Sequence, residues 1–174
     1  SGYGVAQQTF QNLTELEEWD TSIAMLSGAL NDNPDDIEFN LMNGRLLLRT
    51  GRNKEAVIYF KKSFSIEPDR IDIPIFLARA LRRNGQTIEA IDTLRELLER
   101  YPENMNALPL MANLSSSIED WVTCLTTWKK IKNIDPLRPD SNYKIANCYL
   151  KLNHLLSKNL NYLQIEKFHF YDQM

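Results

Sequence analysis

The sequence predicts an all-α fold, a solenoid of about five antiparallel helix pairs, and three observations support this prediction. Four prolines recur at a fixed interval of 34 residues, at Pro34, Pro68, Pro102 and Pro136. A fixed period of this length is typical of helical repeats, in which each helix pair covers the apolar face of the next. Small residues recur at the eighth and twentieth places of the frame, and bulky apolar residues recur at the twenty-fourth place. Small side chains let neighbouring helices approach closely, while the bulky ones fill the space between them.

Length and composition are those of an ordinary folded protein. The chain has 174 residues, of which 43% are hydrophobic and 25% are charged, values typical of a folded domain rather than a disordered segment. The net charge of -3 argues against nucleic-acid binding, because nonspecific nucleic-acid binders are usually basic. No apolar run approaches the ~20 residues that cross a bilayer, and the N-terminus lacks a basic segment followed by an apolar one. We therefore expect no membrane span and favour a cytoplasmic location.

Residues 37–70 show the repeat unit most completely. The apolar spacing of residues 37–50 predicts a first helix, and Gly51 predicts its end because glycine readily takes left-handed backbone angles. A second helix is predicted for residues 55–66, and Pro68 prevents its continuation. Because few residues join the two helices, they must pack antiparallel and leave an apolar face for the next pair.

The same frame divides the chain into windows of 34 residues, at 3–36, 37–70, 71–104, 105–138 and 139–172. We expect a single array over residues 3–168 and a tail, 169–174, that continues into a larger protein. The outer windows are degenerate, because Glu17 and Glu119 stand where the second window has Gly51, and Lys158 stands where a small residue belongs. In the fourth window, residues 117–120 are similar to a helix capping box, which predicts how that turn forms without glycine.

The second window resembles the tetratricopeptide repeat (TPR) family in the residues that the family pattern requires, namely Gly44, Gly51, Ala56, Phe60 and Pro68. The third window is close to the same pattern, and the resemblance extends over roughly residues 3–168. It implies a right-handed superhelix whose concave groove is lined by the first helix of each pair. It also implies that the second, fifth, sixth, ninth, twelfth and thirteenth places of each window point into that groove.

The side chains expected in the groove form a polar ladder beside an apolar strip. The ninth places hold Gln11, Arg45, Arg79, Asn113 and Asn147, and the same surface is extended by Arg49, Arg82 and Arg83. The apolar strip consists of Leu41, Met42, Ile75, Phe76, Leu110 and Tyr143, of which Leu41, Met42, Phe76 and Tyr143 are the expected contacts. Guanidinium groups bind carboxylates in a bidentate manner, so we expect an acidic peptide or protein partner with hydrophobic anchors. The alternative is a solvated surface on which Glu38 and Asp72 neutralise the arginines.

Motifs for catalysis, metal binding or cofactor binding do not occur in the sequence, which has no phosphate-binding glycine loop, His-Glu-x-x-His, nucleophile elbow or Cys-x-x-Cys. We therefore expect no enzyme activity in this segment, no metal site and no cofactor. The two histidines, His154 and His169, lie fifteen residues apart without a carboxylate pair near them. Cys124 and Cys148 are expected to be buried thiols, and their position on consecutive helices leaves a disulfide open.

Two classes of function follow from the sequence. The first is a non-catalytic protein–protein interaction scaffold that binds a peptide or protein partner in its groove. The alternative is an accessory region of a larger enzyme, for example a glycosyl- or other group-transferase, that positions substrate or mediates oligomerisation. Apolar residues within 162–171 suggest that a further domain or a second copy of the chain packs on the C-terminal helix.

Overall fold

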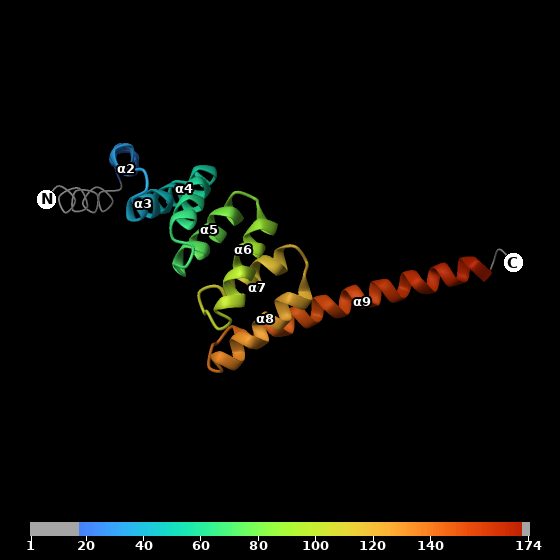
Figure 1. Cartoon of the computed structure of the whole chain (residues 1–174). Coiled ribbons are helices and arrows are strands. Elements are labelled where there is room, and N and C mark those ends of the chain that lie inside the picture. The colour runs from blue at the N-terminus through green and yellow to red at the C-terminus, as the bar shows by residue number, and fades with distance from the viewer. Residues whose placement is uncertain (1–17, 172–174) are drawn as a thin grey trace. The chain divides into compact units, whose positions relative to one another are not determined.

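The structure is a computed structural model that describes residues 18–171, with side chains up to Lys158. Within residues 18–171 the chain forms eight helices and no strand (Figure 1). In chain order these are α2 (Trp19–Asp32), α3 (Ile37–Arg49), α4 (Asn53–Ile66), α5 (Asp72–Arg83), α6 (Thr87–Arg100), α7 (Leu108–Ser117), α8 (Trp121–Ile134) and α9 (Ser141–Tyr171). The all-α prediction is confirmed, and α3 to α8 lie two to a window in residues 37–70, 71–104 and 105–138.

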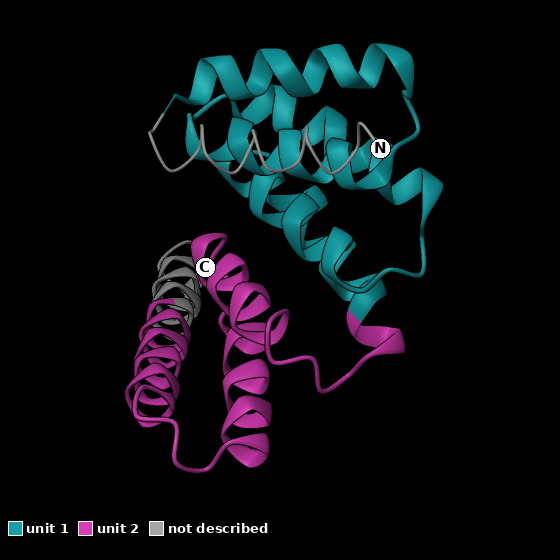
Figure 2. Ribbon diagram, turned by 90° about the vertical axis from the view of Figure 1, so that its left-hand side faces the viewer, with its two compact units in different colours: residues 1–97 teal, residues 98–174 magenta. Residues whose placement is uncertain are grey.

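The chain divides into two compact units, residues 1–97 and residues 98–174, coloured teal and magenta in Figure 2. In the first unit, α3 packs against α2, α4 and α5, and α4 also packs against α5. In the second unit, α8 packs against both α7 and α9. Most contacts inside each unit therefore join helices that are consecutive in the sequence, and α3 also meets the first helix of the next pair, α5, as expected for an array of helix pairs.

The turns inside the second, third and fourth windows share one backbone conformation. At the fifteenth place of each window the φ angle is positive, 80° at Gly51, 81° at Gly85 and 61° at Glu119. The next residue donates its N–H to the carbonyl five residues earlier, at 2.8 Å for Arg52, 2.9 Å for Gln86 and 2.9 Å for Asp120. This is the Schellman arrangement, which satisfies carbonyls at the end of a helix. Glu119 therefore replaces glycine in conformation as well as in position.

The turn at Glu119 is completed differently from the predicted capping box. Asp120 is the N-cap of α8, and its carboxylate accepts a hydrogen bond from the Thr123 backbone N–H at 3.0 Å. The Ser117 hydroxyl instead donates to the carbonyl of Leu114 at 2.7 Å, within its own helix. The prediction placed the cap one turn too early, because an acidic residue directly before a helix is itself a good cap.

The fifth window differs from the expected helix pair. Residues 141–171 form one continuous helix, α9, and the fifteenth place, Asn153, lies inside it. No glycine interrupts this segment, and the following residue is His154 rather than a capping aspartate. Without a second helix folded back on it, α9 leaves Ala146 and Lys158 exposed, although both occupy places where a small residue is otherwise buried. In the first window, residues 3–17 lie outside the described residues.

The small-residue places pack as predicted in the windows that form pairs. Ala56, Ala78, Ala90 and Ala112 are completely buried. Gly44 belongs to the same class, and a Cβ added there would lie 2.9 Å from two ring atoms of Phe60, which is itself completely buried. Close approach between helices therefore depends on these positions, because a protein interior has little free volume.

Both cysteines lie in the core of the second unit. Cys124 on α8 and Cys148 on α9 pack with Leu108, Ala112, Leu125, Trp128 and Ile131. Cys124 is 2% exposed and Cys148 is 1% exposed, which confirms the predicted burial. Their sulfur atoms lie 2.7 Å apart, and both are free thiols in the structure. Burial, together with a hydrogen bond from the neighbouring thiol, raises the pKa of Cys124 from 9.0 to about 12.

Candidate functional site

The ninth-place arginines of the first unit converge on one aromatic ring. Arg45 on α3 and Arg79 on α5 are both exposed, and their guanidinium carbons lie 5.3 Å and 5.9 Å from the centroid of the Phe76 ring. Distances below ~6 Å are those of cation–π contacts, each contributing about 0.5–1 kcal/mol at an exposed site. We call Arg45, Phe76 and Arg79 the arginine–phenylalanine cluster.

A buried aromatic side chain supports this cluster from below. The Phe76 ring stacks on the Phe60 ring of α4 with a centroid distance of 5.7 Å and an interplanar angle of 12°. Phe60 is completely buried and lies against Gly44 of α3. Phe76 is half-buried, so it has one supported face while its guanidinium neighbours remain in solvent. The position of the two charges is thus set by core packing, since Phe60 has no room to move.

The charges of this cluster are not neutralised within the part of the chain that the structure describes. Neither Arg45 nor Arg79 forms an ion pair there. If the surface binds no partner, the sequence predicts that Glu38 and Asp72, at the second places of their windows in α3 and α5, neutralise Arg45 and Arg79. Both carboxylates form ion pairs with Arg70 instead.

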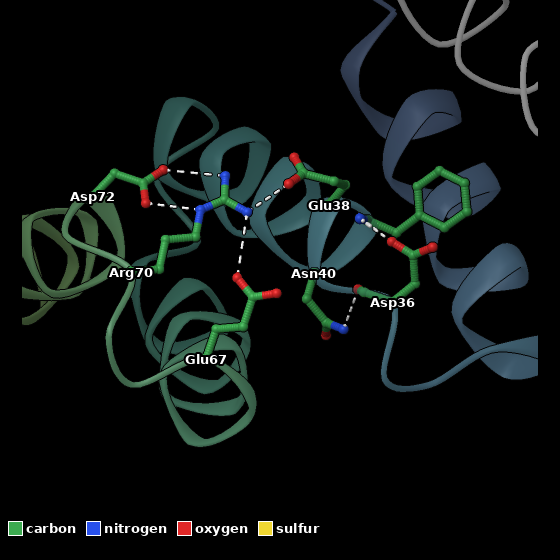
Figure 3. Close-up of polar contacts among 7 residues, drawn as sticks. Asp36, Glu38, Asn40, Glu67, Arg70 and Asp72 are labelled. Atoms are coloured by element: carbon green, nitrogen blue, oxygen red, sulfur yellow. Dashed lines mark hydrogen bonds and ion pairs between the residues drawn. The ribbon is translucent and has the colours of Figure 1, made fainter.

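Arg70, in the turn between α4 and α5, holds the carboxylates at the starts of α3 and α5 (Figure 3). Its Nη1 lies 2.5 Å from Glu38 Oε1, and its Nε lies 2.9 Å from Asp72 Oδ1. Glu67 is more distant, at 3.9 Å. The hydrogen bonds that Arg70 donates to the carboxylates of Glu38 and then Asp72 raise the pKa of Arg70 above its ordinary value. Arg70 therefore pairs with the two carboxylates that the alternative interpretation assigned to Arg45 and Arg79.

Arg70 was not among the residues predicted for the site, although the sequence contains a signal for it. Arg70 and Asp72 are two residues apart, and two windows later the second unit has Arg138 and Asp140 in the same places. That pair is also formed, with Arg138 Nε 2.9 Å from Asp140 Oδ1. A comparison of the last place of each window with the second place of the next would have revealed the pairing.

The other arginines predicted for the groove have individual contacts. Arg49 lies over the ring of Trp19 in α2, with its guanidinium carbon 4.5 Å from the ring centroid. Arg83 donates from Nη1 to the backbone carbonyl of Leu48 at 2.8 Å, and so satisfies a carbonyl at the end of α3. Its own carbonyl accepts from Asn53 Nδ2 at 3.2 Å. Arg82 is exposed. Thus Arg83 connects α3, α4 and α5, whereas Arg45 and Arg79 remain available.

The predicted apolar strip is only partly accessible. Leu41 is 4% exposed and belongs to the core, whereas Met42 is half-buried. In the second unit, taken by itself, Asn113 on α7 is exposed, Asn147 on α9 is half-buried, and Tyr143 is 71% exposed. In the first unit, Met42 and Phe76 are therefore the predicted apolar residues that can meet a ligand.

Two further properties bear on function. Among the described residues, no three His, Cys, Asp or Glu side chains come close enough together to hold a metal ion. None of the described helices combines the length and the apolar character needed to cross a membrane.

The repeats of this sequence match the model of a known protein family. A family model described as cytochrome c-type biogenesis protein H TPR domain matches residues 4–142. The chain belongs to this TPR family. Comparison of the sequence with curated proteins finds no similar one. A TPR domain is a scaffold for protein–protein interaction, and the TPR solenoid is the fold of this chain.

Solved structures agree with the fold. MamA is similar with a TM-score of 0.79 and 16% identity, over 92% of this chain and 87% of that one. A tetratricopeptide repeat protein from Parabacteroides merdae has a TM-score of 0.80 and 17% identity, over 87% of this chain and 60% of that one. YrrB, described as a TPR protein with an unusual peptide-binding site, has a TM-score of 0.70 and 17% identity, over 83% of this chain and 74% of that one. At these identities the likeness concerns the fold alone.

Proposed function

We propose that the face formed by α3 and α5 binds an acidic segment of a partner protein, with Arg45 and Arg79 as its charged contacts. The observation that carries this proposal is the arginine–phenylalanine cluster itself. Two guanidinium groups share one supported aromatic ring and have no carboxylate partner among the described residues. Each lies within 6 Å of the same centroid, so one short segment of a partner can reach both.

Charge and shape favour a carboxylate ligand over a neutral one. Two nearby cations repel one another, and an anion between them removes that repulsion while gaining charge-assisted hydrogen bonds. Arg70 also favours an anionic ligand, because its ion pairs with Glu38 and Asp72 offset the negative charge of these two carboxylates. These carboxylates lie seven residues before Arg45 and Arg79 in the same helices, or ~10 Å along the helix axis. That distance is about one Debye length at 0.1 M salt, so free carboxylates would weaken the attraction for an acidic peptide at low ionic strength.

The apolar part of the ligand is expected to contact Met42 and the open edge of Phe76. Both side chains are half-buried, so covering them removes apolar surface from water without displacing the core. Aromatic and arginine side chains often account for most of the binding free energy of an interface. The proposed partner segment therefore combines at least one carboxylate with an adjacent apolar side chain.

A peptide array tests this proposal directly. Each peptide rich in Glu and Leu is paired with one in which Gln replaces Glu, and binding of the full chain is then measured by fluorescence anisotropy with the labelled peptides. We expect the Glu peptides to bind more tightly, and the affinity to fall as salt is raised because the charges are exposed. In the double variant R45E/R79E, we expect the affinity to fall at least tenfold, corresponding to about 1.4 kcal/mol.

The matched control keeps the net charge change but moves it to another face. Lys54 and Arg95 are exposed on α4 and α6, and K54E/R95E changes the net charge as much as R45E/R79E does. Retained affinity in K54E/R95E supports the proposed site. Equal losses in the two double variants would show only a general charge effect, and equal binding of Glu and Gln peptides would refute the acidic ligand.

A second candidate role follows from the family match, whose description names cytochrome c-type biogenesis. In this role the partner would be a protein of cytochrome c assembly that carries the acidic segment. Affinity capture from the source cells with the wild-type chain and with R45E/R79E, read by mass spectrometry, tests it. Cytochrome c assembly proteins that are retained by the wild type and lost in the variant support this role. Their absence from both samples counts against it.

A further inference from the structure

Two thiols meet inside the second unit at the contact between α8 and α9. The sulfur atoms of Cys124 and Cys148 are 2.7 Å apart, and a disulfide bond requires about 2.05 Å. Less than about 1 Å of further approach is therefore needed. These are the only two cysteines in the 174-residue chain, so no other intramolecular pairing competes.

We propose that Cys124 and Cys148 form an intramolecular disulfide that fastens α9 to α8 under oxidising conditions. The oxidant is a small-molecule disulfide such as oxidised glutathione. In the balanced reaction, the two thiols lose two protons and two electrons and become joined through a new S–S bond. Oxidised glutathione accepts both electrons and both protons, its own S–S bond breaks, and two glutathione molecules are released. The proposal does not depend on what the first unit binds.

The surroundings of the two sulfur atoms determine when this reaction occurs. Both cysteines are at most 2% exposed, so a glutathione molecule cannot reach them in the folded unit. The raised pKa of Cys124 also keeps its thiol protonated near neutral pH, and a protonated thiol is a poor nucleophile. We therefore expect the bond to form while the unit folds, or when it opens, and to resist reduction once it is enclosed.

Cross-linking at this point restrains the part of α9 that packs on the core. Cys148 lies seven residues into α9, which begins at Ser141, or about two helical turns. The closed loop contains the whole turn between α8 and α9. Closing a loop of about 25 residues reduces the entropy of the unfolded chain and stabilises the folded one. For a chain of this size we expect the melting temperature to rise by about 7–14 °C.

The test uses the full chain, unfolded in denaturant and refolded in a glutathione redox buffer. After refolding, the protein is denatured at low pH, treated with an alkylating reagent and weighed by mass spectrometry. We expect a mass lower than that of the reduced chain by about 2 Da, with no alkylated cysteine. We also expect reduction by dithiothreitol to be at least tenfold slower in buffer than in denaturant, because the bond is buried. Reduction should lower the melting temperature of the wild type, while that of C148S should not depend on the redox buffer.

Several outcomes would overturn the proposal. Two alkylated cysteines after refolding in excess oxidised glutathione would show that the bond does not form. A glutathione adduct on each cysteine, or a disulfide-linked dimer, would show that the sulfur atoms react separately. These readings come from the wild-type chain, so they remain valid even if C148S fails to fold.

Discussion

Gly44 and Phe60 form the contact on which the arginine–phenylalanine cluster rests, and their coupling can be measured. A Cβ at position 44 would lie 2.9 Å from Cε1 and Cζ of Phe60 and 3.2 Å from Cδ1. Phe60 is completely buried and stacked on Phe76, so its ring cannot rotate away freely. We predict that G44A destabilises the chain although alanine is the better helix former.

The expected magnitude comes from two opposing contributions. Replacing glycine by alanine inside a helix such as α3 stabilises it by about 1 kcal/mol. Overpacking a filled core costs about 1–3 kcal/mol. The net loss is therefore about 0–2 kcal/mol, and each kcal/mol lowers the melting temperature of a chain of this length by ~2–4 °C. In an F60L background the approaching ring atoms are gone, so the same G44A change should stabilise the chain by about 1 kcal/mol.

Urea unfolding followed by circular dichroism on the wild type, G44A, F60L and the double variant gives the coupling energy. We expect about 2 kcal/mol, within the ~0.5–3 kcal/mol seen for residues in contact. The slope of the free energy against urea must stay constant for the comparison to hold. Stabilisation by G44A in both backgrounds, with no coupling, would refute the packing argument and the support it gives to Phe76.

Three further predictions follow from the turns, the ion pairs and the thiols. Glu119 has a φ of 61°, a left-handed conformation that glycine adopts at lower cost than glutamate. We therefore expect E119G to raise the free energy of unfolding measured in urea. The gain is at most about 1 kcal/mol, because glycine also makes the unfolded chain more flexible. R70Q removes the ion pairs with Glu38 and Asp72 and should lower the free energy of unfolding at low salt by only about 1 kcal/mol, because these pairs are exposed. It should also weaken acidic-peptide binding in the anisotropy assay, because Glu38 and Asp72 then lack a cationic partner. Because the folded pKa of Cys124 is raised from 9.0 to about 12, the folded reduced chain holds this proton more tightly than the unfolded chain. The resulting stabilisation is complete below pH 9 and declines between pH 9 and 12, and C124S should lack this part of the decline in unfolding measurements.

The repeat frame could be predicted from the sequence because its period depends on residues with strong local effects. Proline ends helices, glycine permits left-handed turns, and small residues permit close packing, so each leaves a visible mark at a fixed place. Within the described residues, the turns at Gly51, Gly85 and Glu119 share one backbone conformation. Their positions follow from the frame alone, since no contact distant in the sequence is needed to place them.

The contacts of the arginines could not be predicted in the same way. The frame placed Arg45, Arg79 and Arg83 on the first helices of their windows, and all three are exposed there. The partners of Arg45 and Arg83, however, lie more than thirty residues away, at Phe76 and Leu48. An arginine side chain is long and can reach several partners, so its sequence position does not determine which one it binds. Only the three-dimensional arrangement separates a structural guanidinium from an available one.

The contrast between Glu119 and Asn153 explains why one degenerate window still turns and the other does not. Both residues occupy the fifteenth place, and asparagine tolerates left-handed backbone angles better than glutamate does. Propensity at that place alone therefore predicts the opposite of what is observed. Asp120 supplies the difference, because its carboxylate caps α8 through the Thr123 N–H, whereas His154 follows Asn153. A cap contributes about 0.5–2 kcal/mol, enough to offset the ~1–2 kcal/mol cost of a left-handed glutamate, so the start of the second helix rather than the end of the first decides whether a pair forms.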